Sequence, residues 1–206
     1  MRRSSLDILR LLREQQLRIF RTTDVMTLTK ITAGAATHAL HRLARRRLIV
    51  PLKRGLWASR ITEPNDPMEA VAYLTAPWPS YISLYSALAR RGVIDEIPSV
   101  IYAVSAGRPA RYSNALGEFR IHHLPTHFFW GFQTERLGTS VFLLAEAEKA
   151  LLDLAYLGLI PRSPLGLPYK RDHRWNLDAR KLVRYAKRFH FPPLERYVRA
   201  LLPNVR

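Results

Sequence analysis

The sequence contains no cysteine, which excludes disulfides and thiolate-ligated zinc fingers and fits a reducing cytoplasm. It also lacks an uninterrupted apolar run near the ~20 residues that a membrane-spanning helix needs. Arg2 and Arg3 are followed by Asp7, Arg10 and Arg13 rather than by an apolar core, so we expect no export signal. No phosphate-binding glycine loop, nucleophile elbow or dinucleotide fingerprint occurs. We therefore expect a cytoplasmic, non-enzymatic protein with no cofactor and no membrane contact.

The chain is instead rich in basic residues, which are concentrated at its two ends. It has 206 residues, of which 48% are apolar, enough to bury a core. Its formal net charge of +17 comes from 33 Lys and Arg against 16 Asp and Glu. Residues 1–62 carry +11, residues 63–160 carry −3, and residues 161–206 carry +9. Because such a surplus attracts polyanions, the distribution predicts two cationic surfaces flanking a near-neutral module.

Two helices are predicted in the first 30 residues. A leucine-rich stripe beside an arginine-rich face predicts a helix over about 4–16, with Ser4 or Ser5 as its cap. A second, short helix is expected to begin after Thr22 or Thr23, whose hydroxyl would accept hydrogen bonds from the first backbone amides. Its inward-facing residues would be Val25, Met26 and Leu28. A turn at 30–32 would end it.

A third helix is predicted over about 33–46, followed by a β-hairpin. Its core positions recur at helical spacing: Ala36, Leu40, Leu43 and finally Leu48. Its opposite face would present Thr37, His38, His41, Arg42 and Arg45. The alternation from Ile49 onward and the pair Arg54-Gly55 predict two strands with a tight turn. Three helices and a hairpin in this order are the plan of a winged helix-turn-helix, so we expect a DNA-binding domain over 1–62.

Each exposed donor in this domain has an expected role on DNA. Arginine can hold guanine with two hydrogen bonds, and His and Thr can contact base edges or phosphates. Lys53 and Arg54 at the hairpin tip would contact phosphates or the minor groove. The predicted DNA-binding residues are Thr23, Thr37, His38, His41, Arg42, Arg45, Arg46, Lys53 and Arg54. The alternative is an ordinary solvated basic helix in a winged-helix domain that binds a protein.

The rest of the chain, 63–206, is expected to be a mixed α+β domain. Two prolines and a change of charge sign at 63–67 place the boundary there. Helices are predicted at 67–76, 83–91 and 145–157. Strands are predicted at 99–106, 118–124, 128–133 and 139–144. Two basic helices would follow at 177–189 and 193–202, so the whole chain falls in the α+β class.

The terminal basic segment predicts a possible second cationic surface. Its basic residues are Lys170, Arg171, Arg174, Arg180, Lys181, Arg184, Lys187 and Arg188. Interleaved with Trp175, Tyr185 and Phe189, they could hold nucleic acid or an acidic protein. Equally, the segment could form amphipathic helices with aromatic side chains packed inward and charges solvated, and charge alone does not choose between the two.

Neither a metal site nor a nuclease centre is favoured by the remaining polar residues. His122 and His123 on a strand would point to opposite faces, and His38 with His41 has no third ligand nearby. A nuclease could be suggested by Glu146, Glu148, Lys149 and Asp153. These residues fall on a predicted helix rather than in an acid-x-lysine strand element, and Lys149 to Asp153 is more simply an i,i+4 ion pair.

Three segments resemble the AbiEi family of antitoxins, transcriptional regulators paired with nucleotidyltransferase-like toxins in bacterial abortive-infection and toxin-antitoxin operons. The family's winged-helix head, which ends in Arg-Gly-x-aromatic-Ala, is similar to FRTTDVMTLTKITAGAATHALHRLARRRLIVPLKRGLWA. The Ser-Ala-Leu helix that opens its second domain is similar to YISLYSALARRGVIDEIP. Its Glu-Lys-Ala-Leu-Leu-Asp helix is similar to AEAEKALLDLAYLG. Together these segments cover about the first three-quarters of the chain in the family's order.

The resemblance implies a head that binds inverted repeats in its own promoter and represses the operon, and a second domain that counters the toxin. On inverted repeats the protein could bind as a dimer. The partners implied are operator DNA and a nucleotidyltransferase-like toxin. In the head the role would fall on Thr37, His38, His41, Arg42, Lys53 and Arg54. In the second domain the residues that match the family pattern and would hold the fold are Ser86, Glu148, Lys149 and Asp153. Trp57 stands where the family usually has Tyr, and the segment after Pro161 matches no family feature.

Two other functions stay open from the residues themselves. The basic surfaces could form an interaction module that binds an acidic toxin or RNA, with DNA contact incidental. The middle module could be a nuclease, which would require that changing Glu148 or Asp153 to Ala abolish cleavage.

Overall fold

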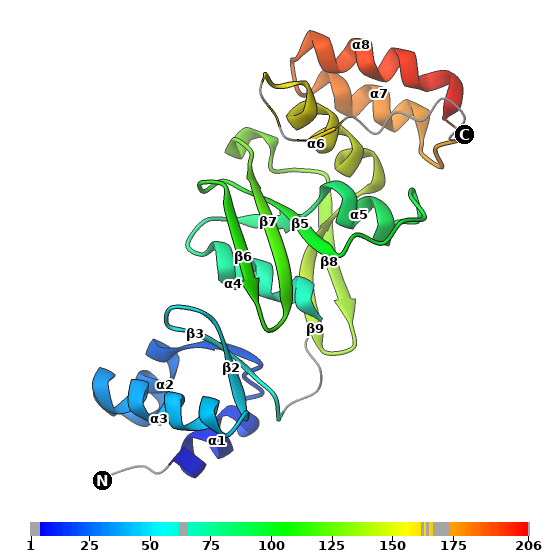
Figure 1. Cartoon of the computed structure of the whole chain (residues 1–206). Coiled ribbons are helices and arrows are strands. Elements are labelled where there is room, and N and C mark those ends of the chain that lie inside the picture. The colour runs from blue at the N-terminus through cyan, green and yellow to red at the C-terminus, as the bar shows by residue number, and fades with distance from the viewer. Residues whose placement is uncertain (1–4, 62–65, 162, 164, 167–173, 206) are drawn as a thin grey trace.

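The structure, a computed structural model, describes residues 5–61, 66–161, 163, 165–166 and 174–205. The fold is α+β, as the sequence predicts. Below, "head" denotes residues 5–61 and "body" residues 66–205 (Figure 1). None of the helices within the described ranges has the length and apolar character needed to cross a membrane.

The head contains three helices and a small sheet. Its helices are α1 (Ser5–Glu14), α2 (Thr22–Thr29) and α3 (Ala33–Arg45). Its antiparallel strands are β1 (Ile19–Arg21), β2 (Ile49–Lys53) and β3 (Leu56–Ser59), in the order β1-β3-β2. The helices pack through Leu12, Val25, Leu40 and Leu43, all buried in one cluster with Trp57. The apolar stripe predicted for α3 is confirmed, apart from half-buried Leu48.

The start of α2 differs from the prediction. The carboxylate of Asp24, not a threonine hydroxyl, accepts from the backbone N–H of Arg21 at 2.7 Å. The Thr22 hydroxyl instead accepts from the indole N–H of Trp57 at 3.0 Å. The predicted inward position of Leu28 is also wrong, because Thr29 is buried in its place and bonds the carbonyl of Val25 at 2.5 Å.

The body is built around a six-stranded mixed sheet in the order β6-β7-β5-β4-β9-β8. Its strands are β4 (Ser80–Ile82), β5 (Val100–Ser105), β6 (Ala110–Asn114), β7 (Gly117–His123), β8 (Phe132–Leu137) and β9 (Ser140–Ala145). The pairs β5–β7 and β4–β9 are parallel, and the other pairs are antiparallel. The central strands are buried on both faces, which explains their apolar sequence.

The helices that accompany this sheet in the described part of the body are α4 (Ala70–Thr75), α5 (Leu84–Arg90), α6 (Ala147–Leu159), α7 (Ala179–Lys187) and α8 (Pro192–Leu201). Short 3₁₀ helices lie at Pro67–Glu69, Thr126–Phe128 and Leu202–Asn204. Figure 1 shows α6, α7 and α8 packed together at the end of the molecule far from the head. The terminal basic helices thus fold onto the body rather than forming a separate tail.

Several of the helices and strands differ from the sequence predictions. The expected strand at 128–133 is wrong in its first half, where a 3₁₀ helix ends and β8 begins only at Phe132. The helix expected at 67–76 is a 3₁₀ helix followed by α4. The strands β1, β4 and β6 were not expected at all. β1 and β4 have three residues each, too few for a periodicity to be visible.

Head and body touch through a continuous contact. Leu52 and Leu56 of the hairpin belong to the main core cluster of the body rather than to that of the head. The guanidinium of Arg18 bonds both carboxylate oxygens of Glu69, at 2.7 and 3.2 Å. The Ser140 hydroxyl donates to the same carboxylate at 2.8 Å. The hairpin is therefore held between the head helices and the body.

Candidate nucleic-acid interface

The outward face of α3 presents one line of donors. Gly34, His38, His41 and Arg45 follow a spacing of four, three and four residues, which places them on one side of a helix. All four are exposed, opposite a buried stripe that includes Leu40. The hydroxyl of Thr32 caps the helix by accepting from the N–H of Ala35. No acidic residue occurs on α3, so the charges of this face are not neutralised within the helix.

The side chains that flank this line are partly positioned by neighbouring elements. Arg42 Nε donates to the hydroxyl of Ser5 on α1 at 3.2 Å, which turns the guanidinium toward the start of α1. The ring of His41 lies edge-on to Trp57, with ring centroids 5.4 Å apart. Thr37 and Arg46 are exposed. His41 and Arg42 therefore have defined directions, whereas the side chains of His38 and Arg45 are exposed to solvent.

The two residues predicted at the hairpin tip have different environments. Arg54 is exposed in the turn between β2 and β3. Lys53 is half-buried, and its ammonium donates to the backbone carbonyl of Leu74 in the body at 2.7 Å. Burial, followed by the charge of Arg21, lowers the pKa of Lys53. Lys53 is therefore not one of the exposed basic residues of the head, whereas Arg54 in the hairpin turn is.

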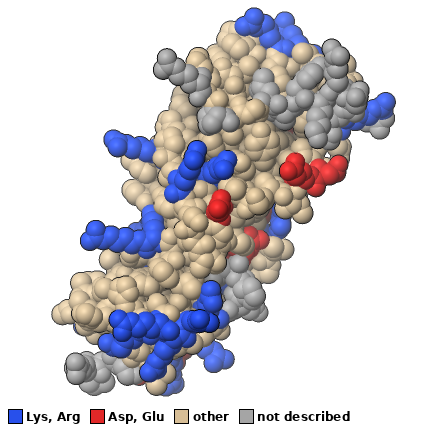
Figure 2. All heavy atoms as spheres, in the orientation of Figure 1, with Lys and Arg blue, Asp and Glu red and all other residues tan. Residues whose placement is uncertain are grey.

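Thr23 is exposed near the start of α2, on a different helix from the α3 donors. Its backbone carbonyl accepts from the Thr27 hydroxyl at 3.0 Å. Figure 2 shows Lys and Arg side chains gathered over the head on the face where α3 lies in Figure 1. The head is thus cationic on the side that carries the predicted DNA-binding helix.

Only some residues of the predicted second basic surface are exposed cations in the described part of the chain. Lys170 and Arg171 lie outside the described residues. Lys181 bonds the carboxylates of Glu148 at 2.9 Å and Glu146 at 3.3 Å. Burial lowers the pKa of Lys181, but the two carboxylates raise it by more, so the net shift is upward. Lys181 is therefore a structural link between α6 and α7.

The remaining basic residues of this surface are exposed: Arg174, Arg180, Arg184, Lys187 and Arg188. The guanidinium of Arg188 lies 3.9 Å from the ring centroid of Trp130, a cation–π contact. Trp175 and Phe189 are buried and Tyr185 is half-buried, as the amphipathic alternative expects. Two further exposed arginines, Arg196 and Arg199 on α8, were not singled out from the sequence because they stand apart from the main basic run.

The pair Lys149–Asp153 forms the predicted i,i+4 contact on α6, and both side chains are 0% exposed. Tyr81 and Ser83 donate to Asp153 at 2.9 and 2.7 Å, and Lys149 Nζ lies 4.9 Å from the ring centroid of Trp130. Burial lowers the pKa of Lys149 and raises that of Asp153, while their mutual contact opposes both shifts. A pair with no exposed surface cannot touch a substrate in this conformation, which agrees with a structural role.

The histidines do not gather into a metal site within the described ranges, where no group of three or more potential ligands occurs. His122 and His123 lie on β7 as predicted, and His122 is half-buried. Burial and then the charges of Arg120 and Arg111 lower the pKa of His122.

No protein-family model matches this chain, and no curated protein matches it significantly. The resemblance to AbiEi antitoxins therefore stays a prediction that rests on the three quoted segments.

Proposed function

We propose that this chain is a DNA-binding transcriptional repressor and the antitoxin of a nucleotidyltransferase-like toxin, similar in kind to AbiEi proteins. In this proposal the head is a winged helix-turn-helix, with α3 in the major groove and the β2–β3 hairpin as its wing. The observation that carries it is the outward face of α3, where His38, His41 and Arg45 are exposed beside slim Gly34. Such a helix can approach a duplex closely and offer donors to bases and phosphates.

The positions of the flanking residues support a division of roles. His41 and Arg42 have fixed directions and would contact base edges, because a defined orientation is what sequence readout requires. Arg45 and Arg46 near the end of α3 would neutralise phosphates. Arg54 would extend the contact from the wing, while Lys53, which is engaged by the body, is left out of the interface.

Mobility shifts on the DNA upstream of the gene test the head. We expect binding that weakens uniformly with salt, and a changed sequence preference when His41 or Arg42 is replaced by Ala. Arg136→Gln, on exposed strand β8 of the body, is the matched control and should leave binding unchanged. Binding that is indifferent to charge reversal by Arg45→Glu would remove α3 from the interface.

The antitoxin role is assigned to the body and has its own test. A nucleotidyltransferase-like reading frame downstream of the gene is expected, and co-expression of this chain should restore growth to cells that express that toxin. Arg45→Glu should abolish repression but leave this rescue intact, because α3 and the body act separately in the proposal. Loss of rescue in Arg45→Glu would contradict the assignment of neutralisation to the body.

A second candidate is an interaction module that binds an acidic toxin or RNA. It is favoured by the exposed arginines of α7 and α8, which lie at the far end of the molecule from α3 (Figure 1). Co-purification with the neighbouring gene product at high salt and without nucleic acid would support it. Retention of that complex after Arg180→Gln and Arg184→Gln would argue against this surface.

A further inference from the structure

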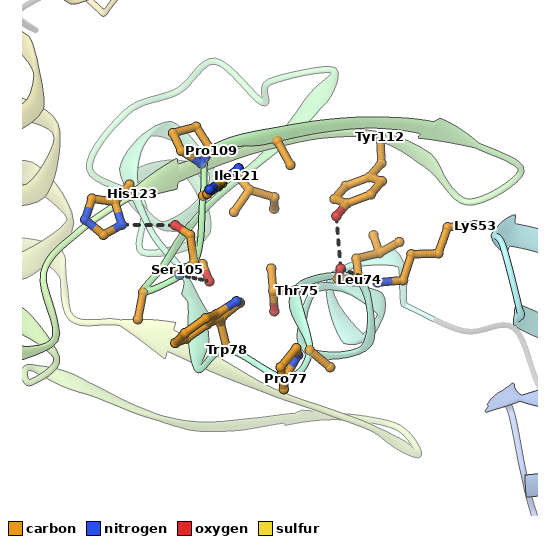
Figure 3. Close-up of a pocket in the computed structure, with 15 residues that line it drawn as sticks. Lys53, Leu74, Thr75, Pro77, Trp78, Ser105, Pro109, Tyr112, Ile121 and His123 are labelled. Carbon is orange, nitrogen blue, oxygen red and sulfur yellow. Dashed lines mark hydrogen bonds between the residues drawn. The ribbon is translucent and has the colours of Figure 1, made fainter. Parts of the chain in front are cut away.

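A cavity of about 640 Å³ lies where the head hairpin meets the body. Its walls come from distant parts of the chain: Lys53 at the end of β2, residues 74–78 at the end of α4 and just beyond it, residues 105–109 at the end of β5 and just beyond it, and strands β6 and β7. Figure 3 shows Lys53 and Tyr112 at one end of this space and Trp78 at the other. The volume is within the roughly 300–1,000 Å³ of typical small-molecule sites.

One end of the cavity offers an exposed aromatic surface. The side chain of Trp78 is 55% exposed, although a tryptophan is costly to leave in water. Its indole lies against Gly107, where a Cβ would come within 2.5 Å of Trp78 Cδ1. Only glycine at 107 therefore permits this position of the ring. Because more than half of Trp78 is exposed, its indole has surface available for a flat partner.

The other end offers a positive charge without a carboxylate. Lys53 and Tyr112 both donate to the carbonyl of Leu74, at 2.7 and 3.1 Å. Because an ammonium has three protons, this bond leaves two donors of Lys53 for a ligand. Arg108 and His123 also line the cavity, with His123 on the side of Trp78 rather than of Lys53 (Figure 3).

Among the residues that the structure describes, those that line the cavity include no aspartate or glutamate. His123 Nδ1 is held by the carbonyl of Gly107 at 3.0 Å, which fixes the orientation of its ring. The walls between the two ends include the apolar side chains of Ile121 and Pro109, together with the hydroxyl-bearing Thr75 and Ser105 (Figure 3). Lys53 and Arg108 would repel a cationic ligand here, so the cavity favours an anion with an apolar, flat body.

We propose that this cavity binds a nucleotide, with the base stacked on Trp78 and the phosphate at Lys53. Base stacking on an aromatic ring accepts any base, and Lys and Arg are the usual phosphate partners. A free mononucleotide and the terminal nucleotide of a strand share this chemistry. The cavity is separate from α3, so this proposal does not depend on whether the head binds duplex DNA.

Titration of the full-length protein tests the site. Calorimetry and tryptophan fluorescence would follow binding of the four nucleoside monophosphates. Adenosine, which lacks the phosphate, and inorganic phosphate, which lacks the nucleoside, would be titrated for comparison. We expect saturable binding of monophosphates, weakened about tenfold or more by Trp78→Ala or by omitting either half of the ligand. Absence of saturable binding by every monophosphate and by a short 5′-phosphorylated oligonucleotide would overturn the proposal.

Matched variants separate the cavity from the rest of the surface. Arg108→Gln lies in the cavity and should weaken binding, whereas Arg136→Gln on β8 should not. Gly107→Ala removes no chemical group but displaces the indole, and should act like Trp78→Ala. Lys53→Met should also weaken binding, but it removes a hydrogen bond between head and body. If the Lys53→Met protein does not fold, Trp78→Ala and Arg108→Gln still test whether the cavity binds the nucleotide. Equal binding by Arg108→Gln, Trp78→Ala and the unaltered protein would refute the site.

The oligonucleotide arm distinguishes the source of the nucleotide. If the short strand binds and monophosphates do not, sensitivity to Trp78→Ala assigns the cavity to strand ends. Insensitivity to Trp78→Ala with sensitivity to Arg45→Gln would assign that binding to α3 and overturn the cavity as a nucleotide site.

Discussion

At the scale of single residues, the buried Lys149–Asp153 pair offers the largest expected effect on stability. Lys149→Met would leave Asp153 buried without its cation, which typically costs about 3–5 kcal/mol. Urea unfolding at pH 7 measures the loss. Lys149→Met combined with Asp153→Asn should recover part of it, because Tyr81 and Ser83 could still donate to a neutral acceptor. Equal stability of Lys149→Met and the unaltered protein would show that the pair is not a structural link.

Tyr197 on α8 should make the fold sensitive to alkali. Burial, and then the nearby Tyr85, raise the pKa of Tyr197 to about 12. An unfolded tyrosine ionises near pH 10, so the folded state favours the neutral phenol. The stabilisation is full below about pH 10 and is lost as the pH rises from about 10 to about 12. Unfolding free energies measured over this range should fall less steeply for Tyr197→Phe, and identical slopes would contradict the assignment.

At the scale of elements, the charge on α3 should be visible in the salt dependence of DNA binding. Each phosphate contact contributes about one unit to the slope of log K against log salt concentration. Arg45→Gln should therefore lower the slope by about one, while Arg136→Gln should leave it unchanged. Filter binding across a salt series measures both. An unchanged slope for Arg45→Gln would mean that Arg45 touches no phosphate.

At the scale of the whole molecule, the Arg18–Glu69 contact should couple head to body. Arg18 and Glu69 are mostly buried and joined by two hydrogen bonds, so Glu69→Gln should cost about 2 kcal/mol. The exposed pair Arg10–Glu14 is a matched control, with side chains 82% and 51% exposed. Glu14→Gln should cost under about 1 kcal/mol. Thermal unfolding measures both changes.

Hydrogen exchange would locate the effect of Glu69→Gln. Amides of β1 and of the β8–β9 hairpin should exchange faster, since Arg18 borders one and Ser140 the other. The head core should keep its protection, because it has its own buried cluster. Uniform loss of protection over the whole chain would mean that head and body unfold as one unit.

The sequence by itself determined the local features of this protein. The helix α3 and its exposed donors follow from apolar residues at helical spacing, and the ion pair on α6 follows from a spacing of four. The hairpin follows from Arg54-Gly55, where Gly55 has a φ of +73° that glycine adopts easily. These features depend on neighbours within a few residues, and such neighbours are visible in the chain.

Only the tertiary structure decided which charges are free. Lys53 resembled Arg54 in sequence, yet the body carbonyl that holds it lies 21 residues away. Lys181 resembled Arg180, yet carboxylates of α6 neutralise it. The cavity beside Gly107 and the three-residue strands β1 and β4 also depend on segments that are distant in sequence. Periodicity describes one element at a time, whereas burial and pairing are set by elements that meet only when the chain folds.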